Sequence, residues 1–113
     1  MKVKLAQLQA RIERIKQEIA ALGEIRPGSI SQQYSVCGNP NCRCADPKNP
    51  QKHGPYHQLS YTRRGRHTTE FVREENLAQV TRQLQDYQTL KRLVDEWMDL
   101  SLEIARLRRE QKG

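Results

Sequence analysis

The sequence has few of the residues that usually build a protein core. Its 113 residues include one Trp, one Phe and four Tyr, and 35% are hydrophobic against 29% charged. A chain of this length makes one domain with a small core, so further stabilising links such as a metal or paired helices are expected. No apolar run approaches the ~20 residues that cross a bilayer, and the N-terminus lacks a signal-peptide core. These absences predict a soluble protein.

Cysteine is also scarce, and all of it lies in one short segment. The three residues are Cys37, Cys42 and Cys44, and an odd number leaves one thiol over in any disulfide scheme. Thiols that stay reduced are typical of the cytoplasm, which is the location we expect. The C-x4-C-x-C spacing with a histidine after it supplies three sulfurs and one nitrogen, a donor set that tetrahedral Zn(II) favours. The segment therefore predicts a structural zinc site.

Two histidines compete for the fourth position of this site. His53 stands directly before Gly54 and Pro55, which stiffen the return of the chain, whereas His57 lies inside a predicted strand. We favour His53 and keep His57 as the alternative ligand.

The residues between the cysteines predict how the backbone presents them. Gly38 and the turn formers at 39–41 bring Cys42 back toward Cys37. Cys42 and Cys44 are expected on one side of an extended segment, with the intervening Arg43 pointing away. The two competing interpretations are ordinary reduced cysteines in a loop and a Cys/His nucleophile, but catalysis requires an oriented base in a shaped pocket.

The wider sequence offers little support for enzymatic chemistry. It contains no paired carboxylates, phosphate-binding loop or nucleophile triad. A zinc ion held by four protein ligands has no open coordination position, which argues against metal-assisted hydrolysis. We expect a binding protein that is not an enzyme and takes no small-molecule substrate.

Two helices are predicted, one at each end of the chain. The first spans residues 1–22, where apolar residues recur at alternating steps of four and three, and Gly23, as a left-handed terminator, and Pro27 end it. The second spans residues 73–112, a stretch without Gly or Pro. The seam of the first helix consists of Met1, Leu5, Leu8, Ile12, Ile15, Ile19 and Leu22, and the second helix carries Leu77, Val80, Leu84 and Tyr87 followed by Leu93, Trp97, Leu100, Ile104 and Leu107.

These periodic segments predict an antiparallel helical hairpin, similar to a coiled coil. Residues Ile12, Ile15 and Ile19 are expected against Trp97, Leu100 and Ile104. A further apolar flank on the second helix, made by Val94, Met98 and Leu102, indicates that two hairpins join in a homo-oligomer.

Between the helices we predict a small β and metal head. Segments 32–36, 56–61 and 67–72 are expected as strands, the last two joined as a β-hairpin whose turn uses a positive φ at Gly65. The fold class is α+β, with a helical hairpin capped by a zinc-stabilised head and boundaries at 1–28, 29–72 and 73–113. The expected packing residues of the head are Tyr34, Leu59, Tyr61, Phe71 and Val72.

The charge of the chain is strongly positive and unevenly distributed. The net charge is +7, and residues 31–72 hold six Lys and Arg against two Asp and Glu. This surplus favours nucleic acid as the partner, with DNA preferred over RNA. A merely solvated basic surface is the simpler alternative, and an adaptor that binds a recombinase or other protein is the rival function. The expected phosphate contacts are Arg43, Lys52, Arg63, Arg64 and Arg66.

Several motifs carry a resemblance to a known but uncharacterised family. The stretches Y-S-V-C-G-N-P-N-C-R-C, H-G-P-Y-H-Q-L-S-Y and T-T-E-F-V, within about residues 29–107, resemble short bacterial and archaeal proteins with a C-G-x3-C-x-C knuckle, an H-G-P-Y element and a long closing helix. Such proteins are often encoded beside transposases and other mobile elements. The resemblance implies that Cys37, Cys42, Cys44 and His53 act as one unit, and that the protein is associated with a mobile element.

Overall fold

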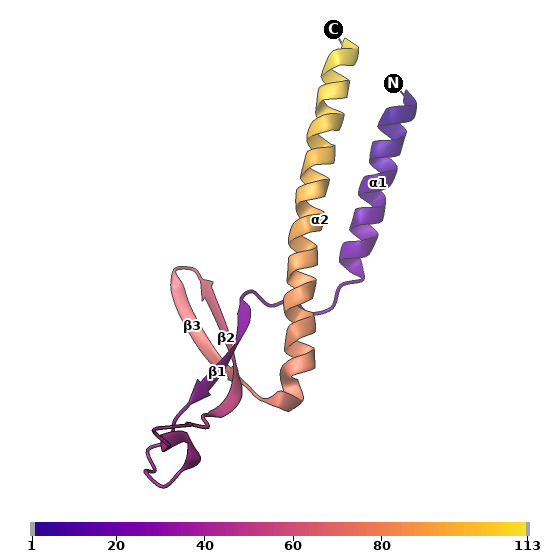
Figure 1. Cartoon of the computed structure of the whole chain (residues 1–113). Helices are drawn as coiled ribbons and strands as arrows, with labels where there is room; N and C mark the ends of the chain where they lie inside the picture. Colours follow the sequence, from indigo (N-terminus) through magenta and orange to yellow (C-terminus); the bar gives the residue numbers. More distant parts are fainter. Residues whose placement is uncertain (1, 113) are drawn as a thin grey trace. The chain divides into compact units, whose positions relative to one another are not determined.

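The computed structural model describes residues 2–112, so Met1 of the predicted seam lies outside the described residues. The chain divides into two compact units: a helical unit of Met1–Ile25 with Gln85–Gly113, and a sheet unit of Arg26–Leu84. The α+β composition is confirmed. In chain order the elements are α1 (Lys2–Ala20), β1 (Ser29–Ser35), the 3-10 turn η1 (Arg43–Ala45), β2 (His53–Arg63), β3 (Arg66–Val72) and α2 (Glu74–Lys112) (Figure 1).

The sheet unit contains a three-stranded antiparallel sheet in the order β1-β2-β3. All three predicted strands exist, but β1 begins at Ser29 instead of residue 32, and β2 extends to His53 at one end and Arg63 at the other. Ile30 pairs with Leu59, and Leu59 pairs in turn with Glu70. Because opposed residues share a face of a sheet, this register sets which side chains lie together.

The β2–β3 hairpin closes through a two-residue turn. Arg64 has φ of 54° and Gly65 has φ of 79°, the pair of positive values that a type I′ turn requires. The predicted positive φ of Gly65 is confirmed. Arg63, the last residue of β2, pairs with Arg66, the first residue of β3, so the turn itself consists of Arg64 and Gly65.

One face of the sheet forms the core of this unit. Leu59, Val72 and Val80 are buried, and partly buried apolar residues pack against them. These surrounding residues are Ile30, Tyr61, Leu77 and Leu84.

Two of the five predicted packing residues do not pack in this core. Leu59 and Val72 are buried and Tyr61 packs against them, whereas Tyr34 is 55% exposed and Phe71 is 63% exposed. The prediction for Tyr34 and Phe71 was wrong. Successive residues of a strand face opposite sides, so Phe71 points away from the face to which its neighbour Val72 contributes.

The helical unit buries four of the apolar residues of the predicted seams. Ile15 of α1 is fully buried. Leu93, Ile104 and Leu107 of α2 are almost fully buried. Polar contacts accompany them: Lys4 Nζ lies 3.2 Å from Glu103 Oε1, and Arg11 Nε lies 2.8 Å from Glu96 Oε1. Neither helix has an apolar stretch long enough, within the described residues, to cross a membrane.

The end of α1 differs from the predicted glycine cap. The helix ends at Ala20, and Gly23 is not among the described glycines with positive φ. Its backbone N–H instead donates to Asp86 Oδ2 over 3.0 Å. The prediction of a left-handed terminator at Gly23 was therefore wrong.

Candidate metal centre

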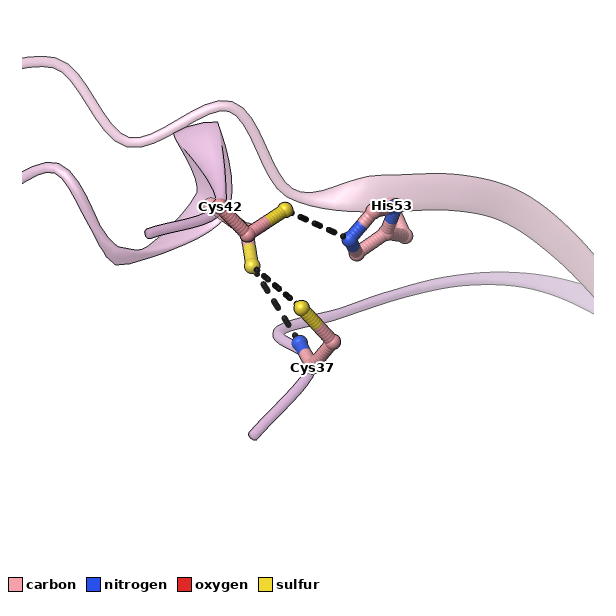
Figure 2. Close-up of side chains that lie close together, drawn as sticks. Cys37, Cys42 and His53 are labelled. Atoms are coloured by element: carbon pink, nitrogen blue, oxygen red, sulfur yellow. Dashed lines mark hydrogen bonds between the residues drawn. The ribbon is translucent and has the colours of Figure 1, made fainter. Parts of the chain in front are cut away.

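Four side chains converge where the chain leaves β1 and re-enters the sheet at β2. The ligand atoms of Cys37, Cys42, Cys44 and His53 all lie within 4.8 Å of one another. Cys37 Sγ is 3.4 Å from Cys44 Sγ, and Cys42 Sγ is 3.1 Å from His53 Nε2 (Figure 2). With Zn–S bonds of about 2.3 Å, a tetrahedral site separates its sulfurs by about 3.8 Å. The cluster is therefore close enough to bind one metal ion.

A tight turn after Cys37 brings the second thiol back, as the residue types predicted. The Cys42 N–H donates to the Asn39 carbonyl over 3.1 Å, and the Asn41 N–H donates to Asn39 Oδ1 over 2.9 Å. This second bond is an Asx turn, in which a short side chain replaces a backbone acceptor. Asn39 thus fixes the chain reversal that places Cys42.

The segment that carries the other two thiols is not extended. Arg43–Ala45 forms the 3-10 turn η1, with only Cys42 before it in an extended conformation, so the predicted strand-like alternation of Cys42 and Cys44 was wrong. The tighter turn arises because the Arg43 carbonyl accepts from the Asp46 N–H and also from the Gln51 N–H, at 3.2 and 3.0 Å. The turn buries Cys44, which is 2% exposed.

His53 reaches the cluster because β2 passes very close to β1 at its start. Gly54 has φ of 133°, and a Cβ there would lie 2.7 Å from the Gln33 carbonyl oxygen. Only glycine accepts this backbone conformation without strain. His57 pairs with Gln32 and Val72 within the sheet and is not in the cluster that the described residues form. The geometry thus favours His53 over His57.

Electrostatics within the cluster favour a thiolate that can bind a cation. The backbone N–H of Asn39, followed by His53 and the other two thiols, lowers the pKa of Cys37 to about 6. The hydrogen bonds that the His53 ring donates to Cys37 and then to Cys42 raise the pKa of His53, whereas burial raises the pKa of Cys44. Thiolates are the form in which cysteine binds metals. A cation placed among the sulfurs would stabilise all three of them in this form.

Comparison with known proteins adds a family to this geometry. Residues 5–82 match a domain of unknown function, DUF6788. The chain belongs to this family. The DUF6788 region includes most of α1 and all of the metal cluster and ends at residue 82, whereas the resemblance found in the sequence began at residue 29 and continued to residue 107. No curated protein and no solved structure matches the chain.

The cations predicted to contact nucleic acid lie in two places within the sheet unit. Arg63, Arg64 and Arg66 are exposed at the tip of the β2–β3 hairpin. Arg43 and Lys52 are exposed on the segment between β1 and β2, residues 36–52, which we call the metal loop. These two groups are at opposite ends of the 11-residue strand β2, which corresponds to roughly 33 Å at 3.3 Å per residue. They are therefore not one cluster. A feature missed in the sequence is the exposed aromatic pair Tyr56 and Phe71, whose ring centroids are 6.0 Å apart.

Proposed function

We propose that the sheet unit is a zinc-stabilised nucleic-acid-binding module and that the protein acts as an accessory factor of a mobile element. The observation that supports this most is the charge of the unit. Residues 26–84 contain nine Lys and Arg against four Asp and Glu. Among the described residues, none of the five predicted contact cations forms an ion pair, whereas Arg26 and Arg73 of the same unit do. Unpaired exposed cations attract phosphate without first having to break an internal contact.

Zinc is the metal that we assign to the cluster. Three thiolates and one imidazole in a closed set of four are typical of structural zinc sites. The sheet unit needs such a link because the core formed by its described residues contains three buried apolar side chains, and metal binding contributes directly to the folding free energy of small domains. When bound, the ion would tie the chain after β1 to the start of β2. The metal loop, with Arg43 and Lys52, would then be held rigid.

Phosphate contacts of this kind carry no base information, so we propose binding with little sequence preference. DNA remains our preferred nucleic acid over RNA. The proposed role is binding and positioning, without catalysis.

A matched pair of charge variants tests this proposal. Replacing Arg63 and Arg66 by Gln and Arg64 by Asn removes three cations, and Asn tolerates the positive φ at position 64. The slope of log affinity against log salt should flatten by roughly two to three units if each arginine neutralises one phosphate. The control replaces Arg14, Arg108 and Arg109, three exposed arginines of the helical unit, by Gln. Equal effects of the two triple variants would show that net charge alone drives binding and would refute the assignment of the hairpin tip.

A second candidate function rests on the helical unit. Val94, Met98 and Leu102 are 40%, 56% and 65% exposed, and their spacing of four places them along one stripe of α2. The contacts of α1 with Glu96 and Glu103 support an antiparallel helical hairpin, because the residue closer to the start of α1 pairs with the residue closer to the end of α2. We propose that two such hairpins join through this stripe. A protein partner, such as a recombinase, is the alternative occupant, and its capture would not weaken with salt.

A further inference from the structure

The outer face of the sheet carries an exposed aromatic pair. Phe71 is 63% exposed and Tyr56 is 38% exposed. Phe71 pairs with Gln58, two residues beyond Tyr56 on β2, so the alternation of strand side chains puts both rings on the same face. Their centroids lie 6.0 Å apart with an interplanar angle of 51°. The opposite face, with Leu59 and Val72, is the one that packs in the core.

The surroundings of this pair are polar and contain no carboxylate. The register gives the outer face Ser31 and Gln33 from β1, Ser60 and Thr62 from β2, and His67 and Thr69 from β3. The one acidic residue of the three described strands, Glu70, lies on the core face, where it accepts from Arg26 Nη2 over 2.8 Å and from the Tyr61 hydroxyl over 3.3 Å. A polyanion approaching the outer face would therefore meet no negative charge on it.

Positively charged residues lie at both ends of the outer face of the sheet. Arg43 and Lys52 belong to the metal loop beside the start of β2, and Arg64 is at the tip of the hairpin. The part of the outer face that lies between these two groups of cations runs along β2 from Tyr56 to Thr62. These six residue steps correspond to roughly 20 Å. A polar face with exposed rings in it and positive charge at each end matches an extended strand of nucleic acid, because unpaired bases stack on aromatic side chains while the phosphates contact cations.

We propose that the outer sheet face binds single-stranded nucleic acid by stacking bases on Tyr56 and Phe71. This inference rests on the proposed function and specifies that the nucleic acid bound is single-stranded. A duplex is a poor ligand for the same surface, because its bases already stack on one another and present no free ring face. Stacking depends on the flat rings, so an aliphatic side chain of similar size does not replace them.

Fluorescence anisotropy with the metal-loaded full chain tests the proposal. The probes are labelled oligodeoxyuridylate and oligouridylate of about 16 nucleotides, the upper site size of small single-strand-binding domains, and a DNA duplex of the same length. The two single strands carry the same base and differ only in the sugar. The variants are Tyr56→Leu with Phe71→Leu, which keep an apolar surface, and Tyr56→Phe with Phe71→Tyr, which keep the rings. Circular dichroism and zinc content confirm that both are folded and loaded.

The expected result is that the parent binds single strands more tightly than the duplex. The leucine variant should lose roughly 5- to 150-fold in affinity for each base that stacks, with an unchanged salt slope because the arginines remain. The aromatic exchange should bind within about threefold of the parent, and the tighter of the two single strands identifies the sugar of the ligand. Equal or tighter duplex binding, or leucine and aromatic variants that bind alike, would overturn the stacking proposal alone. No binding of the parent to any probe would overturn the proposed function as well.

Discussion

Gly54→Ala is the substitution that most directly probes how the sheet positions His53. The glycine has φ of 133°, and the added Cβ would lie 2.7 Å from the Gln33 carbonyl oxygen and 3.1 Å from the Tyr34 ring. The backbone oxygen belongs to β1 and cannot swing aside, so the start of β2 must shift. The neighbouring His53 would then move relative to Cys42, its partner at 3.1 Å.

Two effects lower the stability of Gly54→Ala: backbone strain and the clash of the added Cβ. A non-glycine residue in such a sparsely populated backbone region costs about 1–3 kcal/mol, and relief of the clash adds to this. At about 4 °C per kcal/mol for a chain of this size, the backbone cost alone should lower the melting temperature of the zinc-loaded protein by roughly 4–12 °C, and the clash should lower it further. Zinc should also be lost more rapidly to a colorimetric chelator, because a displaced imidazole weakens the site.

Gly38→Ala is the matched control for this experiment. It makes the same chemical change beside Cys37, another residue of the cluster, but a Cβ at Gly38 meets nothing within 4 Å, and Gly38 is not among the glycines with positive φ. We expect its melting temperature and zinc release to stay at the parent values or to improve slightly. If Gly54→Ala behaved like Gly38→Ala in both measurements, the close approach of β1 and β2 would not be what holds His53 in place.

The helical unit allows two further predictions. The Arg11 guanidinium lowers the pKa of the Glu96 carboxyl below its ordinary value of 4.5. This pair therefore stabilises the fold above that pH, and the contribution disappears as the pH falls through the lower folded value. The melting temperature of Glu96→Gln should lie below that of the parent at pH 7 and converge with it near pH 3; a gap that stays the same at both pH values would contradict this. Replacing Met98 and Leu102 by Glu should convert a homo-oligomer to a monomer in light scattering, since both side chains are exposed on one stripe of α2, and the same change at the exposed Gln85 and Gln88 should not; a parent that is already monomeric at micromolar concentration would rule out self-association.

The cluster of four possible ligand side chains could be predicted from the sequence because its members lie close together along the chain. All four donors fall within residues 37–53, and donor type and turn residues alone restrict what such a segment can do. The backbone conformation between these four residues could not be predicted from the residue types. The turn at Arg43–Ala45 depends on the Gln51 N–H reaching back to the Arg43 carbonyl, a contact that has no signature in the residue types.

The exposure of Phe71 could not be predicted from the sequence, for a different reason. Alternation in β2 and β3 separates two sets of side chains correctly, but it does not tell which set will be covered. The covering comes from Leu77, Val80 and Leu84 of α2, which pack with Leu59 and Val72. The prediction that Phe71 packs in the core assumed that a small sheet must use every aromatic it has. The helix supplies the apolar area instead and leaves the Phe71 ring on the outer face.

Zinc content is the measurement that tests the metal centre most directly. Native mass spectrometry of protein purified without chelators should show each chain with one zinc ion. Histidine variants locate the fourth ligand: His53→Ala should lose the metal or hold it weakly, while His57→Ala, which lies outside the cluster, should retain it. A folded parent free of metal would contradict the account, and so would zinc retained by His53→Ala but lost by His57→Ala.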